Sequence, residues 1–285
     1  ETGVNTYMNF TLITTFHKPG LDQYAQTMID TFEQYWPDSV NLVCYAENCT
    51  PKTTKSNVKI VDLHERSPDL VAFKNKFKTV PWANGEQMKE TGLKFESNNF
   101  KWDAVRFSNK VFTVIDACQT IDSDWVIWID ADSKTHSPVT EEFLQQVCPG
   151  SHFASYLGRR AKYHSECGWV AYNVNHPDCQ QFMLDWRDLY VNEGVFDLKE
   201  YHDSYVFDVL RKQYQANGTK FYNLSPELPG KGTGHPFIAS PLGTVMDHMK
   251  GFRRKELGHS FAEDVTVRNQ GVNRDVKYWK RVTKS

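Results

Sequence analysis

Two carboxylates follow a continuous apolar run near the middle of the chain. The run spans residues 125–129 (Trp-Val-Ile-Trp-Ile), and Asp130 and Asp132 come directly after it. Carboxylates two residues apart on an extended chain point to one side, and their hard oxygen atoms suit Mg²⁺ or Mn²⁺. A divalent ion held there could bridge a diphosphate and stabilise the charge that develops on a leaving nucleotide. The alternative is a solvated turn that happens to contain two acids.

A histidine and several basic residues near the C-terminus form a second group. His248 could be a third metal ligand, because a neutral imidazole binds divalent ions well. Lys250 and the basic run Arg253-Arg254-Lys255 could hold phosphate oxygens. A basic surface loop is the alternative for this segment alone. Together with the acidic pair, the two segments predict one metal–diphosphate site.

The elements that must position these residues alternate between strand and helix. Strand-like runs cover residues 10–16, 41–45, 58–63, 125–129, 152–157, 168–174 and 219–224, and helical spacing covers 21–35, 103–121, 141–147, 179–189 and 206–210. This order predicts an α/β fold with a mostly parallel central sheet flanked by helices, whose ligands bind beyond the carboxyl ends of the strands. The polar segment 65–101 is predicted to be an irregular excursion, not a separate domain.

The order of elements and the two motifs resemble glycosyltransferases of the GT-A fold. Asp130 and Asp132 match the D-x-D motif of those enzymes, and His248 matches a late histidine that often completes their metal shell. The resemblance implies a GT-A-like sheet with a Rossmann-like nucleotide-binding half. It also implies one catalytic domain, which we expect to cover residues 4–285. The opening Glu1-Thr2-Gly3 has no methionine and is expected to be a processing remnant.

The same resemblance assigns the ligands of a nucleotide-sugar donor and of Mn²⁺ or Mg²⁺. A UDP-sugar is the favoured donor and a GDP-sugar is possible. The implied metal ligands are Asp130, Asp132 and His248. The implied donor contacts are Thr14, Thr15, Phe16, Asp103, Arg106, Lys110, Asp130, Lys250 and Gly251.

Two carboxylates are candidates for the catalytic base that would activate an acceptor hydroxyl. Asp203 opens a predicted helix, where such enzymes often place an acid near the acceptor, and it would make the enzyme inverting. The alternative is that Asp203 only caps the helix. Glu166 is the other candidate base. His202 could bind the acceptor, but a packed histidine is the favoured interpretation.

Two other functions fit parts of the pattern. A phosphatase of the haloacid-dehalogenase type also uses an apolar strand followed by D-x-D, but near the N-terminus and with Thr or Val where this chain has Lys134. A non-catalytic module that binds a sugar or a metal is the second alternative, and the retained candidate base argues against it.

Bulk composition limits the partners. The net charge of −2 and the lack of a basic stripe disfavour nucleic acid, and no apolar run is long enough to span a membrane. The acceptor is expected to be a glycan, a protein or another hydroxyl compound. Cys44 and Cys49 could form a bridge, but the six cysteines fit free thiols in a reducing compartment as well as disulfides. Their even number, four Asn-x-Ser/Thr sequons and the lack of an initial methionine favour a secretory lumen or secretion over the cytoplasm.

Overall fold

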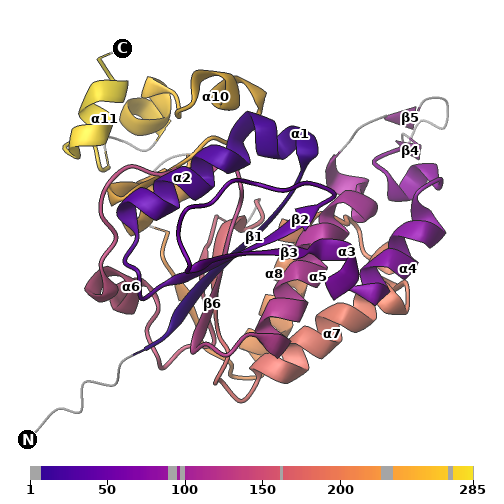
Figure 1. Cartoon of the computed structure of the whole chain (residues 1–285). Coiled ribbons are helices and arrows are strands. Elements are labelled where there is room, and N and C mark those ends of the chain that lie inside the picture. Colours follow the sequence, from indigo (N-terminus) through magenta and orange to yellow (C-terminus); the bar gives the residue numbers. More distant parts are fainter. Residues whose placement is uncertain are drawn as a thin grey trace, which may run out of the picture.

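The computed structural model describes residues 8–88, 95–96, 100–160, 163–225, 234–268 and 272–284 of the 285-residue chain (Figure 1). The expected processing remnant at residues 1–3 lies outside the described residues. The extent of the predicted single domain, residues 4–285, therefore stays a prediction.

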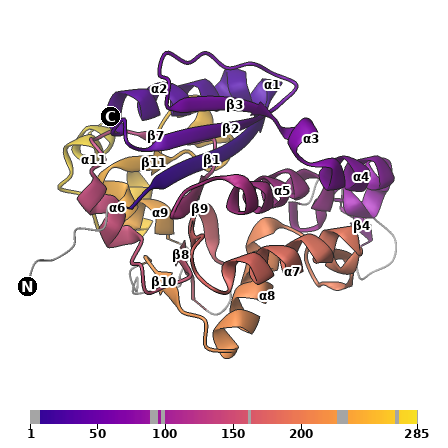
Figure 2. The same cartoon turned by 60° about the horizontal axis from the view of Figure 1, so that its bottom comes forward.

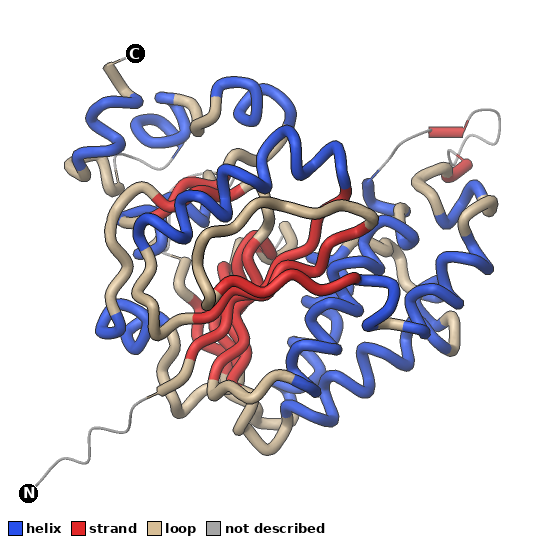
Figure 3. The backbone as a smooth tube through the Cα atoms, in the orientation of Figure 1, coloured by secondary structure: helices blue, strands red, loops and turns tan. Residues whose placement is uncertain are grey.

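A seven-stranded sheet forms the centre of the molecule, with the strand order β10-β8-β9-β6-β1-β2-β3 (Figure 3). Strand β9 runs antiparallel to both of its neighbours, and the other pairs in this sheet are parallel. The predicted α/β fold class with a mostly parallel sheet is confirmed. The strands are β1 (Phe10–His17), β2 (Asn41–Glu47), β3 (Val58–Asp62), β6 (Trp125–Ile129), β8 (Ala154–Leu157), β9 (Glu166–Asn173) and β10 (Phe221–Asn223).

Helices cover both faces of this sheet (Figure 2). One face carries α1 (Lys18–Gly20), a π-helical turn (Leu21–Ala25) and α2 (Gln26–Tyr35), and the other carries α5 (Ala104–Thr120), α7 (Cys179–Val191) and α8 (Asp203–Ala216). Successive residues of β1 serve the two faces, as the alternation of a strand requires. Leu12 packs in the hydrophobic cluster that contains Phe32 of α2, and Ile13 packs in the cluster that contains Val111 of α5.

The segment predicted to be irregular between residues 65 and 101 contains helices, so that prediction was wrong for the part that the structure describes. Helices α3 (Leu63–Arg66) and α4 (Pro68–Phe77) are followed by 3₁₀ turns at Pro81–Ala83 and Phe100–Trp102 and by the short strands β4 (Gln87–Met88) and β5 (Phe95–Glu96). Leu70, Phe73 and Phe77 of α4 are buried. Their helical spacing supplies an apolar face that the many lysines of the segment obscure in the sequence.

The C-terminal part of the chain packs along the α2 side of the sheet (Figure 1). Strand β11 (Met246–His248) pairs with β7 (Ser133–Thr135), and Trp279 of the last helix joins the hydrophobic cluster of α2. The remaining elements are α6 (Glu141–Val147), α9 (Pro236–Ala239), α10 (Phe252–Leu257), α11 (Lys277–Val282), a π-helical turn (Asp264–Arg268) and 3₁₀ turns at Gly194–Asp197 and Pro241–Thr244.

The six cysteines are free thiols, so Cys44 and Cys49 do not form the bridge that their spacing allows. Within the described residues, no helix combines the length and the apolar character that crossing a bilayer would require.

Candidate active site

The acidic pair lies where β6 ends at the edge of the sheet. All five residues of β6 are buried, which fixes the position of Asp130 directly after the strand. The backbone N–H of Asp130 donates to the carbonyl of Gly168 on β9, 3.0 Å away, and the N–H of Ser133 donates to the carbonyl of Asp130, also at 3.0 Å. The resulting turn presents Asp130 and Asp132 from a rigid backbone.

A short antiparallel ladder brings His248 to this turn across more than one hundred residues of chain. Its register places His248 opposite Ser133. The backbone N–H of Met249 donates to the carbonyl of Asp132 at 2.9 Å, which extends the pairing to the acidic turn itself. The D-x-D turn and the late histidine therefore meet because β7 and β11 pair.

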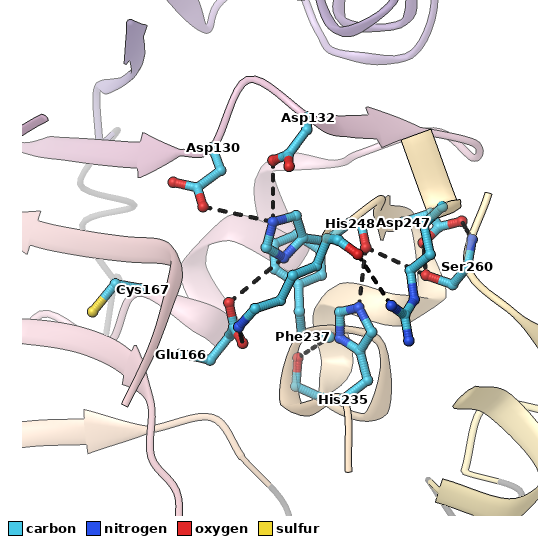
Figure 4. A network of polar contacts seen from close by, with 12 residues as sticks. Asp130, Asp132, Glu166, Cys167, His235, Phe237, Asp247, His248 and Ser260 are labelled. Atoms are coloured by element: carbon cyan, nitrogen blue, oxygen red, sulfur yellow. Dashed lines mark hydrogen bonds and ion pairs between the residues drawn. The ribbon is translucent and has the colours of Figure 1, made fainter. Parts of the chain in front are cut away.

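The three side chains converge on one point (Figure 4). His248 Nε2 lies 3.2 Å from Asp132 Oδ1 and 3.6 Å from Asp130 Oδ2, and one ligand atom from each residue falls within 4.8 Å of the others. His248 Nδ1 lies 3.7 Å from Glu166 Oε1, so Glu166 and the aspartates face different nitrogens of the ring. Two carboxylates and one imidazole form a donor set that suits Mn²⁺ or Mg²⁺, with positions left for ligand oxygens.

The His248 ring is held by close packing. Its side chain is 2% exposed. Gly168 leaves it the necessary space, because a Cβ at that position would lie 2.5 Å from His248 Cε1. Behind the ring, His235 Nε2 lies 3.0 Å from the carbonyl oxygen of His248.

Asp132 keeps its negative charge because cations lie next to it. Burial would raise the pKa of Asp132, but His248 and the Lys255 ammonium, 2.9 Å from Asp132 Oδ2, lower it overall. Burial would lower the pKa of His248, but Asp132, Glu166 and Asp130 outweigh burial and raise it. Positive charge is therefore favoured at this point, as a metal-binding site requires.

Lys110 connects the acidic pair with Asp203. Its Nζ lies 3.1 Å from Asp130 Oδ1 and 2.6 Å from Asp203 Oδ2. Burial opposes the charge on Lys110, but the two aspartates raise its pKa overall; burial also opposes the charge on Asp203, and Lys110 lowers the pKa of that carboxyl. Asp203 is the first residue of α8 and follows the cap residue His202, so the structure places it beside the candidate site.

Glu166 lies on the other side of His248 and is also paired with cations. It contacts Arg159, and its Oε2 lies 2.6 Å from Lys250 Nζ. Burial would raise the pKa of Glu166, but Lys250, His248 and Arg159 hold it well below its ordinary value. Glu166 is therefore an ionised group that organises cations around the histidine.

A cavity of about 200 Å³ opens beside Glu166. Its polar lining contains four long cationic side chains and two carboxylates. The lining residues are Arg159, Glu166, Gly234, His235, Lys250, Arg254, Asp264 and Arg268. Arg254 is held in place by a two-point contact with Asp264, at 2.6 and 2.7 Å. The excess of cations makes the cavity suitable for an anionic group.

Four residues that are predicted to meet the nucleotide make contacts within the fold: Thr14, Thr15, Phe16 and Asp103. Thr14 and Phe16 are buried in the sheet, and the Thr15 hydroxyl donates to the carbonyl of Tyr45 at 2.7 Å. The Asp103 side chain caps α5 by accepting from the backbone N–H of Arg106, 3.1 Å away. The roles of these residues in donor binding stay predictions.

Arg106 and Gly251 lie on the periphery of the same region. The Arg106 side chain is exposed. Burial and Asp132 raise the pKa of Tyr24, whereas Arg106 lowers it. Tyr24 is therefore within electrostatic reach of both residues. Gly251 has a φ of +82°, a conformation that favours glycine, and it caps α10 directly after Lys250.

Sequence reasoning missed several neighbours of the site. His235 lies in a segment with no helical or strand period, and Arg159 and Tyr24 have no motif that would single them out. Tertiary packing alone brings His235 to His248, Arg159 to Glu166, and Tyr24 to Lys255. Lys255 belongs to the predicted basic run, but its direct contact with Asp132 was not foreseen.

No protein-family model matches this chain, and no curated protein matches it. Its fold is similar to solved glycosyltransferase structures. One is mouse xyloside xylosyltransferase 1 in its apo form, at 11% identity over 76% of this chain and 85% of that chain, with a TM-score of 0.47. A glycosyltransferase involved in glycosylation of the major capsid of PBCV-1 is similar at 13% identity over 87% and 96%, with a TM-score of 0.46. An active-site mutant of LgtC follows at 12% identity over 70% and 69%, with a TM-score of 0.43. These likenesses concern the fold alone.

Proposed function

We propose that the protein is a metal-dependent glycosyltransferase that moves a sugar from a nucleotide-diphospho-sugar to an acceptor hydroxyl. The observation that carries the proposal is the convergence of Asp130, Asp132 and His248 at the end of β6, where an α/β fold binds its ligands. The cations that surround these residues suit a ligand with a diphosphate.

Asp130, Asp132 and His248 would hold Mn²⁺ or Mg²⁺. When bound, such an ion neutralises charge on a diphosphate and on the departing nucleotide. His248 is held by its close packing against Gly168, so its Nε2 needs little rearrangement to serve as a ligand. That preorganisation supports a binding site over a solvated turn.

Lys250 and Lys255 would hold phosphate oxygens. Each now contacts a carboxylate, Glu166 and Asp132 respectively, so a phosphate would replace one anionic partner with another. The cationic cavity beside Glu166 lies on the same side of His248 as Lys250. A UDP-sugar is the donor that we would test first, with GDP-sugars second.

The candidate bases differ in how many cations pair with them. Both have lowered pKa values because cations pair with them, and a general base works best with a pKa near the working pH. Asp203 has Lys110 as its close cation, whereas Glu166 has Lys250, Arg159 and His248. We therefore keep Asp203 as the first candidate. A product with inverted anomeric configuration supports this role, and a retained configuration removes it.

The proposal is tested by incubating the protein with UDP- and GDP-sugars and measuring release of nucleoside diphosphate with Mn²⁺ or with a chelator. We expect one donor to be turned over only with metal, and Asp132→Asn to reduce the rate at least about 100-fold, because losing a direct ligand should exceed the loss known for an outer partner. The matched control is Asp38→Asn, which removes a carboxylate that is 84% exposed.

Three results would contradict the proposal. Turnover that neither the chelator nor Asp132→Asn reduces would remove the metal site from the chemistry. Release of inorganic phosphate without nucleoside diphosphate would instead indicate the phosphatase alternative. Tight metal-dependent donor binding with no turnover would indicate the non-catalytic alternative.

A further inference from the structure

A second group of metal-binding side chains lies beside the start of α8. His202 Nε2 lies 2.8 Å from Glu200 Oε2, and His164 Nε2 lies 3.4 Å from the same oxygen. One ligand atom from each residue falls within 4.8 Å of the others. Ligands of a tetrahedral ion with bonds of about 2.0–2.2 Å lie roughly 3.3 Å apart, so small side-chain movements would make the three a ligand set.

The local backbone explains why two of these ligands point the same way. Glu200 and His202 are two residues apart, and His202 is extended, with φ −74° and ψ 155°. Tyr201 between them is directed away, with its ring 5.3 Å from that of Phe196, and its backbone N–H donates to the carbonyl of Lys101 at 2.6 Å. The anchored tyrosine therefore forces Glu200 and His202 to one side.

Aromatic rings hold the two imidazoles in place. The ring of His202 lies 5.2 Å from Phe100 and 6.2 Å from Phe107, and the ring of His164 lies 5.0 Å from Tyr205. His202 is almost fully buried, whereas the side chain of His164 is 33% exposed. The group is thus rigid on one side and reachable from solvent on the other, as an ion with a water ligand requires.

The charges of the group also suit a metal. Burial lowers the pKa of His202, and the neutral imidazole is the form that binds a metal. Burial would raise the pKa of Glu200, but His202 and Lys101 lower it overall, so the carboxyl is ionised. Lys101 Nζ lies 3.5 Å from Glu200 Oε1 and leaves Oε2 directed at the histidines.

We propose that His164, Glu200 and His202 bind a divalent transition metal of the Zn²⁺ class. Two imidazoles and one carboxylate are softer than the Asp130–Asp132–His248 set, which favours zinc over manganese at this point. The site joins the connection between β8 and β9 to the residue before Asp203. A bound ion would therefore fix the start of α8 beside the candidate active site.

The experiment is a zinc titration of metal-stripped protein, measured by calorimetry and by the shift in Tm. The background is Asp132→Asn, which removes a ligand of the first site. We expect one zinc ion to bind with a rise in Tm. Adding His164→Gln, which changes a partly exposed side chain and is expected to spare the fold, should weaken binding at least tenfold. His152→Gln, the matched control, should not.

Equal zinc binding by the Asp132→Asn protein with and without His164→Gln would overturn the proposal, as would no zinc binding at all. In either case, the histidines and Glu200 would form only a hydrogen-bonded group. The result is independent of glycosyl transfer, because the readout is metal binding by a protein whose first site is already disabled.

Discussion

Two clusters of histidine and carboxylate lie close together in this molecule, and they differ in what surrounds them. The first cluster, Asp130, Asp132 and His248, contacts two lysines, Lys110 and Lys255. In the second cluster, His202 contacts the aromatic rings of Phe100 and Phe107. The lysines suit an ion that carries a diphosphate, and the aromatic rings suit an ion that fixes the backbone. The residues around a ligand set therefore influence its role as much as the ligands do.

The largest effect on stability should come from Lys110, the buried cation beside the first cluster. Lys110→Met would leave Asp203 and Asp130 without their partner, and we expect a loss of about 3–5 kcal/mol in the free energy of unfolding. Lys101→Met is the matched change at the second cluster. Its side chain is 44% exposed, so it should cost at most about 1 kcal/mol.

Urea unfolding of both variants measures the difference. Lys110→Met combined with Asp203→Asn should recover part of the loss, because one unpaired charge is then removed. Equal losses in the free energy of unfolding for Lys110→Met and Lys101→Met would show that burial does not distinguish the two clusters.

A smaller effect should follow from filling the space beside His248. The Cβ of Gly168→Ala would lie 2.5 Å from His248 Cε1 and 2.7 Å from Nδ1. Since the ring is buried and cannot move aside, we expect a loss of about 1–3 kcal/mol in stability and weaker Mn²⁺ binding. Zinc binding at the second cluster should be unchanged.

Thermal unfolding and metal titration of Gly168→Ala test this expectation. The control is Gly150→Ala, whose added Cβ meets no atom within 4 Å. Tight Mn²⁺ binding by Gly168→Ala, with unaltered Tm, would show that the position of the His248 ring is not critical.

The metal preference of the second cluster should depend on its ligands. His164→Asp gives it two carboxylates and one imidazole, the composition of the first cluster. In the Asp132→Asn background, we expect the preference for Zn²⁺ over Mn²⁺ to fall on the order of tenfold. Competition titrations measure this ratio. An unchanged preference would mean that the surroundings, and not the ligand types, select the ion.

The smallest effect should come from the aromatic neighbours. The ring of Phe100 meets His202 edge to face at 5.2 Å, and such pairs contribute about 0.5–1.5 kcal/mol. Phe100→Leu should therefore weaken zinc binding by roughly two- to tenfold. Phe252→Leu, at an exposed phenylalanine of α10, is the control. Equal zinc affinities for both variants would contradict a role for the ring.

The amino-acid sequence alone predicted the α/β fold class and the three residues, Asp130, Asp132 and His248, that we propose as metal ligands. Strand β6 is apolar throughout and ends at an acid, so its burial and the position of Asp130 follow from local pattern alone. Helix α4 escaped prediction because Lys74 and Lys76 stand between the buried Phe73 and Phe77, and a short apolar face is hard to recognise in a lysine-rich segment.

Only the tertiary structure decided which side chains meet. The pairing of β7 with β11 brings His248 to Asp132. The packing of α5 beside α8 brings Lys110 to Asp203. His164 meets Glu200 in the same way, from a connection that has no period of its own. The physical reason is that a period encodes which face a residue occupies, whereas a contact between distant segments depends on how all the faces pack together.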